Sequence, residues 1–462
     1  MRMFIRSLFG GYPKAYWYLL LGTLINGIAM FVLPFEALYL VGSRHLPVEQ
    51  ASAIMAVYGI GSCLSALIGG SLSDRIGRRP TIISGLFCLS MTTFGLAAAT
   101  PTWLIALLTF CLGFWMSWSR PALSAAVNDL VPLERQARAN GLLYWVYNIG
   151  AAISPLLASV IVLHTSYTML FCADGLGTLL FCVLIAVGLS ETGPPFAPSV
   201  QRHQILPKPT SRKRSMFPDS RFLLFTVLSF LLTSIYFQYL STLPADMQIH
   251  GLSAAHYGEA LAVNGIVVAV LGLPLAHLLD RFAPFRALAA SALFLGLGFG
   301  LTALADHLLS LPVYVGSIVV WTMGEIVFVP VSATMVALFS PPTRRGLYQG
   351  IARTSWGLSA CAGPLVGGII LQQWGAFLWI GCAVLGCLLA CSFFLLEQSK
   401  KPLSSDENDI PFFPEKHGLI DVTPDMAQRW STDRRQAEPR EKGPEEMADL
   451  ISMSAEGERR TP

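Results

Sequence analysis

The sequence predicts an all-α integral membrane protein of twelve transmembrane helices, arranged as two six-helix pseudo-repeats. Of its 462 residues, 53% are hydrophobic and only 13% are charged, whereas soluble domains are about a quarter charged. Twelve apolar stretches are long enough to cross about 30 Å of hydrocarbon. Five marker residues also recur at one fixed distance along the chain. A lipid bilayer is therefore the expected solvent for most of the molecule.

Each expected span has roughly 20 residues or more, the length that a helix needs to cross the hydrocarbon core. The spans are 16–41, 50–72, 81–100, 102–127, 139–163, 167–189, 221–244, 255–279, 285–305, 311–337, 346–371 and 374–396. The first is too long for the apolar core of a signal peptide and lacks a small-x-small cleavage site. We therefore expect it to be an uncleaved first span.

The basic residues predict the orientation of these spans. Of the 21 Lys and Arg residues before residue 398, 18 fall on one side of the membrane, and Arg44 alone falls on the other. The remaining two, Arg120 and Arg353, lie within spans. Because loops on the cytoplasmic side carry an excess of Lys and Arg, we expect both termini in the cytoplasm. A plasma membrane, the inner membrane of a bacterium, is the expected location.

Composition divides the chain into four parts. Residues 1–190 form one expected six-helix bundle, and residues 221–397 form the other. Between them, residues 191–220 are rich in Pro and basic residues, which is typical of a cytoplasmic linker. The tail, residues 398–462, carries ten basic and fourteen acidic residues and is expected to be disordered. Nothing in the tail identifies a partner.

Five residues of the first half have counterparts 209 residues later. Pro121, Pro132, Arg135, Gly141 and Pro155 correspond to Pro330, Pro341, Arg344, Gly350 and Pro364. A six-helix unit used twice explains this pattern. Paired repeats of this kind place the binding site of a secondary transporter near the bilayer midplane, between the two repeats.

The stretch GSLSDRIGRR, between the second and third spans, resembles the signature loop of the major facilitator superfamily. The matching residues are Gly70, Asp74, Arg75, Gly77, Arg78 and Arg79. The second half keeps Asp280 and Arg281 in the equivalent loop but lacks the glycine. The resemblance covers roughly residues 15 to 397. It implies the major facilitator fold and transport by alternating access.

The fifth span resembles the glycine and proline pattern of the family's antiporters. It carries Gly141, Gly150 and Pro155, and the eleventh span carries a second copy in Gly350, Gly363 and Pro364. Three family glycines are replaced here by Ser154, Ala158 and Ser159, which are small enough to preserve close helix packing.

The stretches TMGEIVFVP on the tenth span and YFQYLSTLP on the seventh resemble those of bacterial proton-coupled multidrug exporters. This resemblance implies proton-coupled efflux, by antiport, of lipophilic and cationic small molecules. A narrow-specificity transporter of a metabolite, sugar or siderophore, with the same fold, stays open as the alternative.

The charges of the signature loop have two interpretations. They satisfy the positive-inside rule, or they form a cytoplasmic gate. Gly77 permits a tight turn, and Asp74 can accept hydrogen bonds from a helix N-terminus such as that of the eleventh span. Arg78 can pair with Asp129, at the end of the fourth span. The resemblance implies a latch of this kind that holds the two halves together.

Three acids within the spans are candidates for proton coupling, because an ionised group in the bilayer is costly unless it is paired or functional. Glu325 lies in the middle of the tenth span, where the alternative is a structural pair with a neighbour such as Arg353. Glu36 can instead be a solvated charge at the outer mouth. Asp174 can instead be a helix-interface residue.

The resemblance implies that spans one, four, seven and ten line the substrate cavity. The candidates for substrate contact are Arg120, Gln238, Tyr239, Asn264, Trp118, Tyr144 and Trp321. Arg120 can bind an anionic substrate or extend toward the cytoplasm. The polar groups can bind substrate or join helices. The aromatic groups can form a pocket wall or anchor helices at the membrane interface.

The sequence lacks the motifs of several other classes of function. The sequence has no Walker loop, no His-Glu-x-x-His and no Gly-x-Ser-x-Gly, and its nine cysteines include no Cys-x-x-Cys pair. We therefore expect no enzyme activity, no cofactor, no metal site and no nucleic acid partner. The expected partners are a small-molecule substrate, protons and the lipid bilayer, and the expected state is a monomer.

Overall fold

The structure, a computed structural model, describes residues 12–191, 219–279, 282–308, 311–341 and 344–398, and all regular structure in them is helical. Asp280 and Arg281 lie outside the described residues. So do residues 192–218 of the predicted linker and residues 399–462 of the predicted tail. The described residues form one compact unit.

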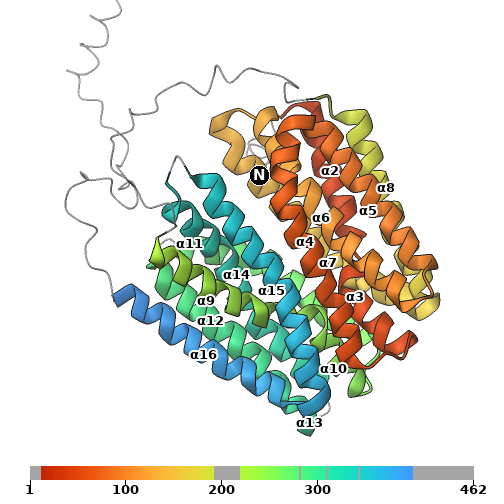
Figure 1. Cartoon of the computed structure of the whole chain (residues 1–462), viewed down its shortest axis with the longest axis vertical. Helices are drawn as coiled ribbons and strands as arrows, with labels where there is room; N and C mark the ends of the chain where they lie inside the picture. Colours follow the sequence, from red (N-terminus) through yellow and green to blue (C-terminus); the bar gives the residue numbers. More distant parts are fainter. Residues whose placement is uncertain (1–11, 192–218, 280–281, 309–310, 342–343, 399–462) are drawn as a thin grey trace, which may run out of the picture. The chain divides into compact units, whose positions relative to one another are not determined.

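The first six spans lie where the apolar stretches predict them. Their helices are α2 (Lys14–Ile28), α3 (Val32–Leu38), the π-helical turn η1 (Tyr39–Ser43), α4 (Val48–Ile76), α5 (Arg78–Ala98), α6 (Thr102–Leu130), α7 (Leu133–His164) and α8 (Tyr167–Gly188). Figure 1 shows them in red to yellow, packed side by side. We call this set the N-terminal group.

The last six spans also match. Their helices are α9 (Ser220–Tyr236), the 3₁₀ turn η3 (Phe237–Leu240), α10 (Thr242–Ile249), α11 (Ala254–Leu279), α12 (Pro284–Leu301), the 3₁₀ turn η4 (Thr302–Leu304), α13 (Ala305–Leu308), α14 (Leu311–Phe339), α15 (Arg345–Trp374) and α16 (Phe377–Gln398). They run from green to blue in Figure 1 and form the C-terminal group.

Eleven segments of the described residues are long and apolar enough to cross a membrane. The predicted span 50–72 corresponds to α4, which has 29 residues. α4 contacts both α6 and α15. At Gly59 and Gly61 the neighbouring backbones approach too closely for a side chain. Glycine at these two positions therefore allows the close contact.

The first span is one apolar stretch but not one helix. Its chain breaks between α2 and α3, and Pro34 stands in the first turn of the restarted helix, where a missing N–H costs nothing. The break frees the backbone N–H groups of Phe31 and Val32. Both donate to Oδ2 of Asp174 on α8, at 2.9 Å each. Asp174 thus caps α3 from a neighbouring helix.

The seventh span breaks in the same way. The chain leaves α9 at Tyr236, makes the turn η3 and restarts as α10, with Pro244 again in the first turn. The predicted single spans 16–41 and 221–244 are therefore each two helices. In both, a buried acid follows the proline by two residues, Glu36 in α3 and Asp246 in α10.

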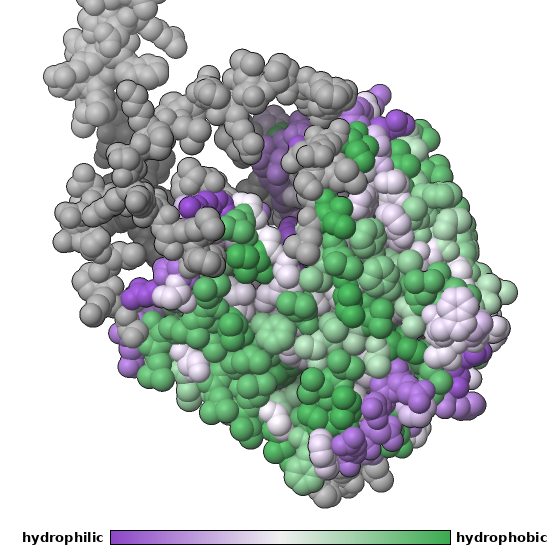
Figure 2. All heavy atoms as spheres, in the orientation of Figure 1, coloured by the Kyte–Doolittle hydropathy of each residue, from purple (hydrophilic) through white to green (hydrophobic). Residues whose placement is uncertain are grey.

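The outer surface of the helices is apolar. Val187 and Phe377 are 75% and 69% exposed, and on the face in Figure 2 hydrophobic residues cover the broad middle while hydrophilic ones gather at the margins. Exposed patches of this size are unfavourable in water and favourable in lipid. The protein is an integral membrane protein.

The two ends of the bundle are named by the loops of the sequence that they carry. The end at Gly77, Val131 and Arg344 carries the basic loops, and we call it the basic end. The end at Ser43, Thr165 and Gly375 is called the opposite end. α10 and α13 lie at the opposite end, in the lower part of Figure 1.

The two groups of helices meet along two contacts, α4 against α15 and α7 against α11. A Cβ added at Gly59 of α4 would lie 2.3 Å from the backbone nitrogen of Cys361 on α15. A Cβ at Gly265 of α11 would lie 2.3 Å from Cα of Ala152 on α7. Glycine therefore allows backbone-to-backbone contact between the groups, as it does between transmembrane helices generally. We call these two contacts the seam.

Candidate substrate cavity and proton site

A cavity of about 1040 Å³ lies between the two groups, on the basic-end side of the seam. Four helices border it: α4, α6, α9 and α15. Its lining residues are Ala66, Pro121, Ser124, Ala125, Asn128, Thr226, Val227, Phe230, Gly346, Leu347, Gln349, Gly350, Ile351, Arg353, Thr354, Ser355 and Leu358. The lining is mostly apolar with a few polar groups, which is typical of a small-molecule site.

Arg120 and Arg353 bring positive charge to this cavity from opposite groups. Arg353 lines it directly, and Arg120 precedes the lining residue Pro121 on α6. Both side chains are exposed. Arg120 precedes the lining residues Ser124 and Asn128 by four and eight residues, so it lies on the same face of α6.

Glu325 lies on α14, where neighbouring helices of the C-terminal group hold both of its carboxylate oxygens. Oε1 accepts a hydrogen bond from the Tyr236 hydroxyl at 2.9 Å, and Oε2 accepts one from Nδ2 of Asn264 at 2.7 Å. Asn264 also donates to Thr322 at 3.0 Å. Among the described interactions, none pairs Glu325 with Arg353 or another cation. Neutral donors alone therefore fix this carboxylate.

Aromatic rings surround this carboxylate. The ring of Tyr239 stacks on Trp321 at 5.8 Å, and Tyr236 meets Trp321 edge-on at 6.0 Å. Trp321 itself is buried and stacks on Phe299 at 5.5 Å. Tyr144, on α7 of the N-terminal group, is exposed. Three of the predicted contact residues, Tyr239, Asn264 and Trp321, therefore cluster around Glu325, and this cluster is not part of the cavity lining.

Gln238 and Trp118 do not line the cavity either. Nε2 of Gln238 is buried and donates to the carbonyl oxygen of Gly363 on α15 at 2.9 Å, and its Oε1 accepts from Thr242 at 2.7 Å. Gln238 thus ties η3 to α15, which is the helix-joining alternative. Trp118 is buried on α6 and stacks on Phe114 at 5.5 Å, so it is a packing residue in this conformation.

Glu36 and Asp174 are both buried within the N-terminal group. Oε1 of Glu36 accepts a hydrogen bond from the Thr109 hydroxyl on α6, and Oε2 has no described partner. Glu36 is 0% exposed, which excludes the alternative of a solvated charge at the outer mouth. Asp174 caps α3, so the helix-interface interpretation describes its contacts.

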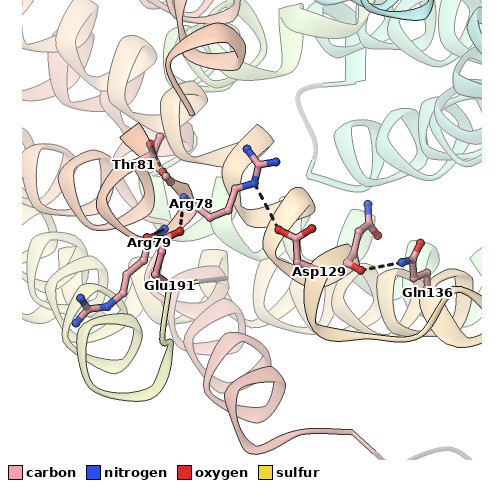
Figure 3. Close-up of polar contacts among 8 residues, drawn as sticks. Arg78, Arg79, Thr81, Asp129, Gln136 and Glu191 are labelled. Atoms are coloured by element: carbon pink, nitrogen blue, oxygen red, sulfur yellow. Dashed lines mark hydrogen bonds and ion pairs between the residues drawn. The ribbon is translucent and has the colours of Figure 1, made fainter. Parts of the chain in front are cut away.

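The signature loop has an additional partner that the sequence analysis missed. Glu191, just after α8, accepts hydrogen bonds from the backbone N–H groups of Arg78, at 2.8 Å, and Arg79, at 3.3 Å, at the start of α5 (Figure 3). Gly77 has a φ of +105°, and a Cβ there would lie 3.0 Å from the Glu191 carboxylate. Only glycine suits this position.

The charge pair of the loop is present, but it lies within one group. Nε of Arg78 is 3.5 Å from Oδ2 of Asp129 on α6, and both residues belong to the N-terminal group (Figure 3). This pair does not join the two halves, as a latch would. Gly70, Asp74 and Arg75 fall in the last turns of α4, where side chains are not described.

The helix-packing motif divides into two sets. A Cβ at Gly150 would lie 2.7 Å from the backbone of Gly27 on α2, and one at Gly363 would lie 2.6 Å from the carbonyl oxygen of Ser234 on α9. Gly141 and Gly350, near the basic end, would meet nothing within 4 Å. Pro155 and Pro364 are buried within α7 and α15. Only part of the motif is in close contact in this conformation.

A second polar cluster at the opposite end was missed from the sequence. Oδ2 of Asp246 on α10 accepts a hydrogen bond from the Tyr314 hydroxyl on α14 at 2.8 Å. Nδ1 of His250 lies 3.7 Å from the same oxygen. The repeated pattern Leu-Pro-x-acid, in Leu33–Glu36 and Leu243–Asp246, is the signal that relates this acid to Glu36. Among the described residues, no group of three or more His, Cys, Asp or Glu is arranged to hold a metal ion.

The fold and the cavity agree with the family comparison. A family model described as the Major Facilitator Superfamily matches residues 19–330 and 247–436. The chain belongs to the major facilitator superfamily. Its fold is also that of a solved major facilitator relative, the peptide transporter POT in complex with sulfate, at a TM-score of 0.70 and 17% identity over 84% of this chain and 95% of that one.

Three relatives resemble this chain at low sequence identity. The uncharacterized MFS-type transporter YqjV of Bacillus subtilis is 25% identical over 78% of this chain and 87% of its own length. Multidrug resistance protein MdtL of Escherichia fergusonii is 25% identical over 78% and 89%. A Na(+), Li(+), K(+)/H(+) antiporter of Planococcus maritimus is 21% identical over 80% and 92%. This major facilitator protein is therefore a membrane-embedded transporter of small molecules.

Proposed function

We propose that this transporter is a proton-coupled antiporter that exports lipophilic small molecules by alternating access. Glu325 binds the coupled proton. The basic end faces the cytoplasm of a bacterial inner membrane, as the positive-inside rule predicts. In this orientation the described conformation is open toward the cytoplasm and ready to receive substrate.

The geometry of Glu325 carries this proposal. Its carboxylate is held by Tyr236 and Asn264 without a cation, so no fixed positive charge stabilises the ionised form inside the membrane. A carboxylate in such a place can take up a proton on one side and release it on the other. The name of the cation/proton antiporter supports antiport, and the name of the multidrug resistance protein MdtL supports export of several compounds.

The aromatic rings around Glu325 support a lipophilic substrate. Tyr236, Tyr239 and Trp321 present ring faces and edges beside one carboxylate. Aromatic faces attract cations, most strongly where water is excluded. A cationic group of a substrate can therefore compete with the proton at Glu325, which is the exchange that an antiporter needs.

The test is proton movement in proteoliposomes that contain a pH-sensitive dye, on addition of lipophilic cations, lipophilic anions and sugars. Several unrelated lipophilic compounds are expected to move protons through the unmodified protein. Glu325→Gln keeps the side-chain shape but cannot carry a proton, so we expect at least a tenfold loss of substrate-dependent proton flux. Glu259→Gln, which removes an exposed carboxylate on α11, is the matched control.

Unchanged coupling in Glu325→Gln would contradict the assignment and move the search to Glu36. A second candidate function has its own observation. The positive charge of Arg120 and Arg353 favours a transporter with narrow specificity for an anionic metabolite. Proton movement that one compound class alone elicits would support this second function over multidrug export.

A further inference from the structure

The seam contains two cysteines that the proposed transport function does not use. Cys63 lies on α4 and Cys361 on α15, so each group of helices contributes one. Both carry free thiols and are partly exposed. Each follows a glycine by four residues, in the stretches GIGSC (59–63) and GLSAC (357–361). The same Gly-x-x-x-Cys spacing therefore occurs on both sides of one contact.

The two stretches face each other in antiparallel register. α4 runs from the opposite end to the basic end, and α15 runs back. A Cβ at Gly59 would lie 2.3 Å from the backbone nitrogen of Cys361, and a Cβ at Gly357 would lie 2.9 Å from Cα and Cβ of Cys63. Each glycine thus receives the cysteine of the facing helix, and the two cysteines lie one helical turn apart along the contact.

The geometry of this contact turns the two side chains toward each other. In an α-helix every Cα–Cβ bond tilts toward the N-terminus, which is from Cys63 toward Gly59 and from Cys361 toward Gly357. Because the helices are antiparallel, these two tilts converge. Disulfides join cysteines whose Cα atoms lie roughly 4.4 to 6.8 Å apart. An offset of one turn, about 5.4 Å, between touching backbones is of this size.

The cysteine pair also adjoins the cavity. Ala66, three residues after Cys63, and Leu358, three residues before Cys361, both line it. Residues three apart share one face of a helix, so the pair lies on the cavity side of both helices. A molecule as small as a peroxide can therefore reach these thiols through a cavity of about 1040 Å³.

We propose that Cys63 and Cys361 form a redox modification site whose disulfide holds the seam closed. The oxidant is hydrogen peroxide or an organic hydroperoxide. One thiolate attacks a peroxide oxygen and breaks the O–O bond, which gives a sulfenic acid and, after uptake of a proton, water or an alcohol. The second thiol attacks that sulfur, forms the S–S bond and releases water. Two electrons pass from sulfur to the peroxide, and a thiol reductant reverses the change.

The disulfide is expected to stop transport. Alternating access requires the two groups of helices to rock against each other, so α4 and α15 must part at the seam in each cycle. A covalent bond between them keeps the protein open toward the basic end. This inference goes beyond the proposed function, because it depends neither on the substrate nor on Glu325.

The first test detects the bond itself. Full-length protein in phosphatidylcholine nanodiscs is treated with hydrogen peroxide, digested and analysed by mass spectrometry. We expect a linked peptide pair that contains Cys63 and Cys361 and that dithiothreitol removes. The matched control combines Cys63→Ala with Leu64→Cys, which keeps the number of thiols. It moves one of them about 100° around α4, to a position that is 41% exposed, so no link to Cys361 is expected.

The second test measures the effect on transport. Peroxide is expected to lower substrate-dependent proton flux in proteoliposomes at least about tenfold, because a required conformational step is blocked, and dithiothreitol is expected to restore it. Cys63→Ala and Cys361→Ala should each keep their flux after peroxide. Cys387→Ala, which removes an exposed cysteine on α16, should stay as sensitive as the unmodified protein.

Three results would overturn the inference. One is the absence of the linked peptide, or an equal yield of linkage to Cys361 in the Leu64→Cys control. Another is full proton flux in protein that carries the link. The third is an equal loss of flux to peroxide in both alanine variants. The peptide measurement needs no transport, so the redox site and the proposed proton coupling can fail independently.

Discussion

In their middle turns α4 and α15 touch through their backbones, whereas at the basic end the same two helices border the cavity. Gly357 of α15 illustrates the first case, because a Cβ there would lie 2.9 Å from the Cys63 backbone on α4. Gly346 and Gly350, at the other end of α15, would meet nothing within 4 Å. One helix thus has a closed half and an open half.

The open half of α15 carries a glycine that has no close neighbour in this conformation. Gly141 and Gly350 are counterparts in the two repeats, and both are open in this conformation. Glycine in a helix interior costs about 1 kcal/mol relative to alanine, with no contact here to offset it. We therefore expect these two glycines to lie in close contact when the basic end closes. When the basic end closes, the open half of α15 would then pack as closely as the closed half packs in this conformation.

The largest expected effect comes from filling the closed half. In Gly59→Leu, the new Cβ would stand 2.3 Å from a backbone nitrogen, which cannot move aside as a side chain can. We expect transport to be lost and the unfolding temperature to fall clearly. Gly350→Leu is the matched control, because its site is open, and its unfolding temperature is expected to stay within about 2 °C. An equal fall in the unfolding temperature of both variants would contradict the comparison.

A moderate effect is expected in chemical labelling of the two ends. In a cysteine-free background, Leu347→Cys in the cavity is expected to react quickly with a water-soluble maleimide. Ser52→Cys, buried against Gly368, is expected to react at least tenfold more slowly. A bound substrate should slow the first reaction and speed the second. Equal rates at the two sites would show that the closed half is not closed.

The smallest expected effects come from weakening two sets of hydrogen bonds, one between the two groups of helices and one within the N-terminal group. Oε1 of Gln372 on α15 accepts a hydrogen bond from the backbone N–H of Val48 on α4 at 3.0 Å. Gln372→Ala is expected to shift the open-to-closed equilibrium by about 1 kcal/mol, seen as faster labelling of Ser52→Cys. Glu191→Gln weakens the cap of α5 within the N-terminal group. It should lower stability slightly without changing that labelling rate.

The spans were predictable because each depends on a local property, the length of an apolar stretch. The helix breaks depend on distant partners. Pro34 and Pro244 were visible in the sequence, but a proline alone only permits a break. The break in the first span needs Asp174, some 140 residues away, to accept the freed N–H groups. The sequence therefore predicted the spans and missed the breaks.

The candidate site was likewise predictable only in part. Glu325 stood out as an acid within an apolar stretch, and its neighbours Asn264 and Tyr239 as polar groups in other spans. Nothing local indicated that α6, which carries Arg120, and α15, which carries Arg353, border one cavity, because they belong to different repeats. Glu191 looked like part of a linker, since its role comes from the turn at Gly77 that it caps.

The seam is made of glycine and other small residues, and this has a kinetic consequence. At Gly59, Gly265 and Gly357 the helices meet mostly through backbone atoms of the facing helix. Parting the helices at these points requires no change of rotamer, so the activation barrier comes from lost dispersion contacts and the few hydrogen bonds across the seam, such as that from Val48 to Gln372. The closed end can therefore open by a rigid tilt, and the turnover rate is left to be set by the substrate and the proton.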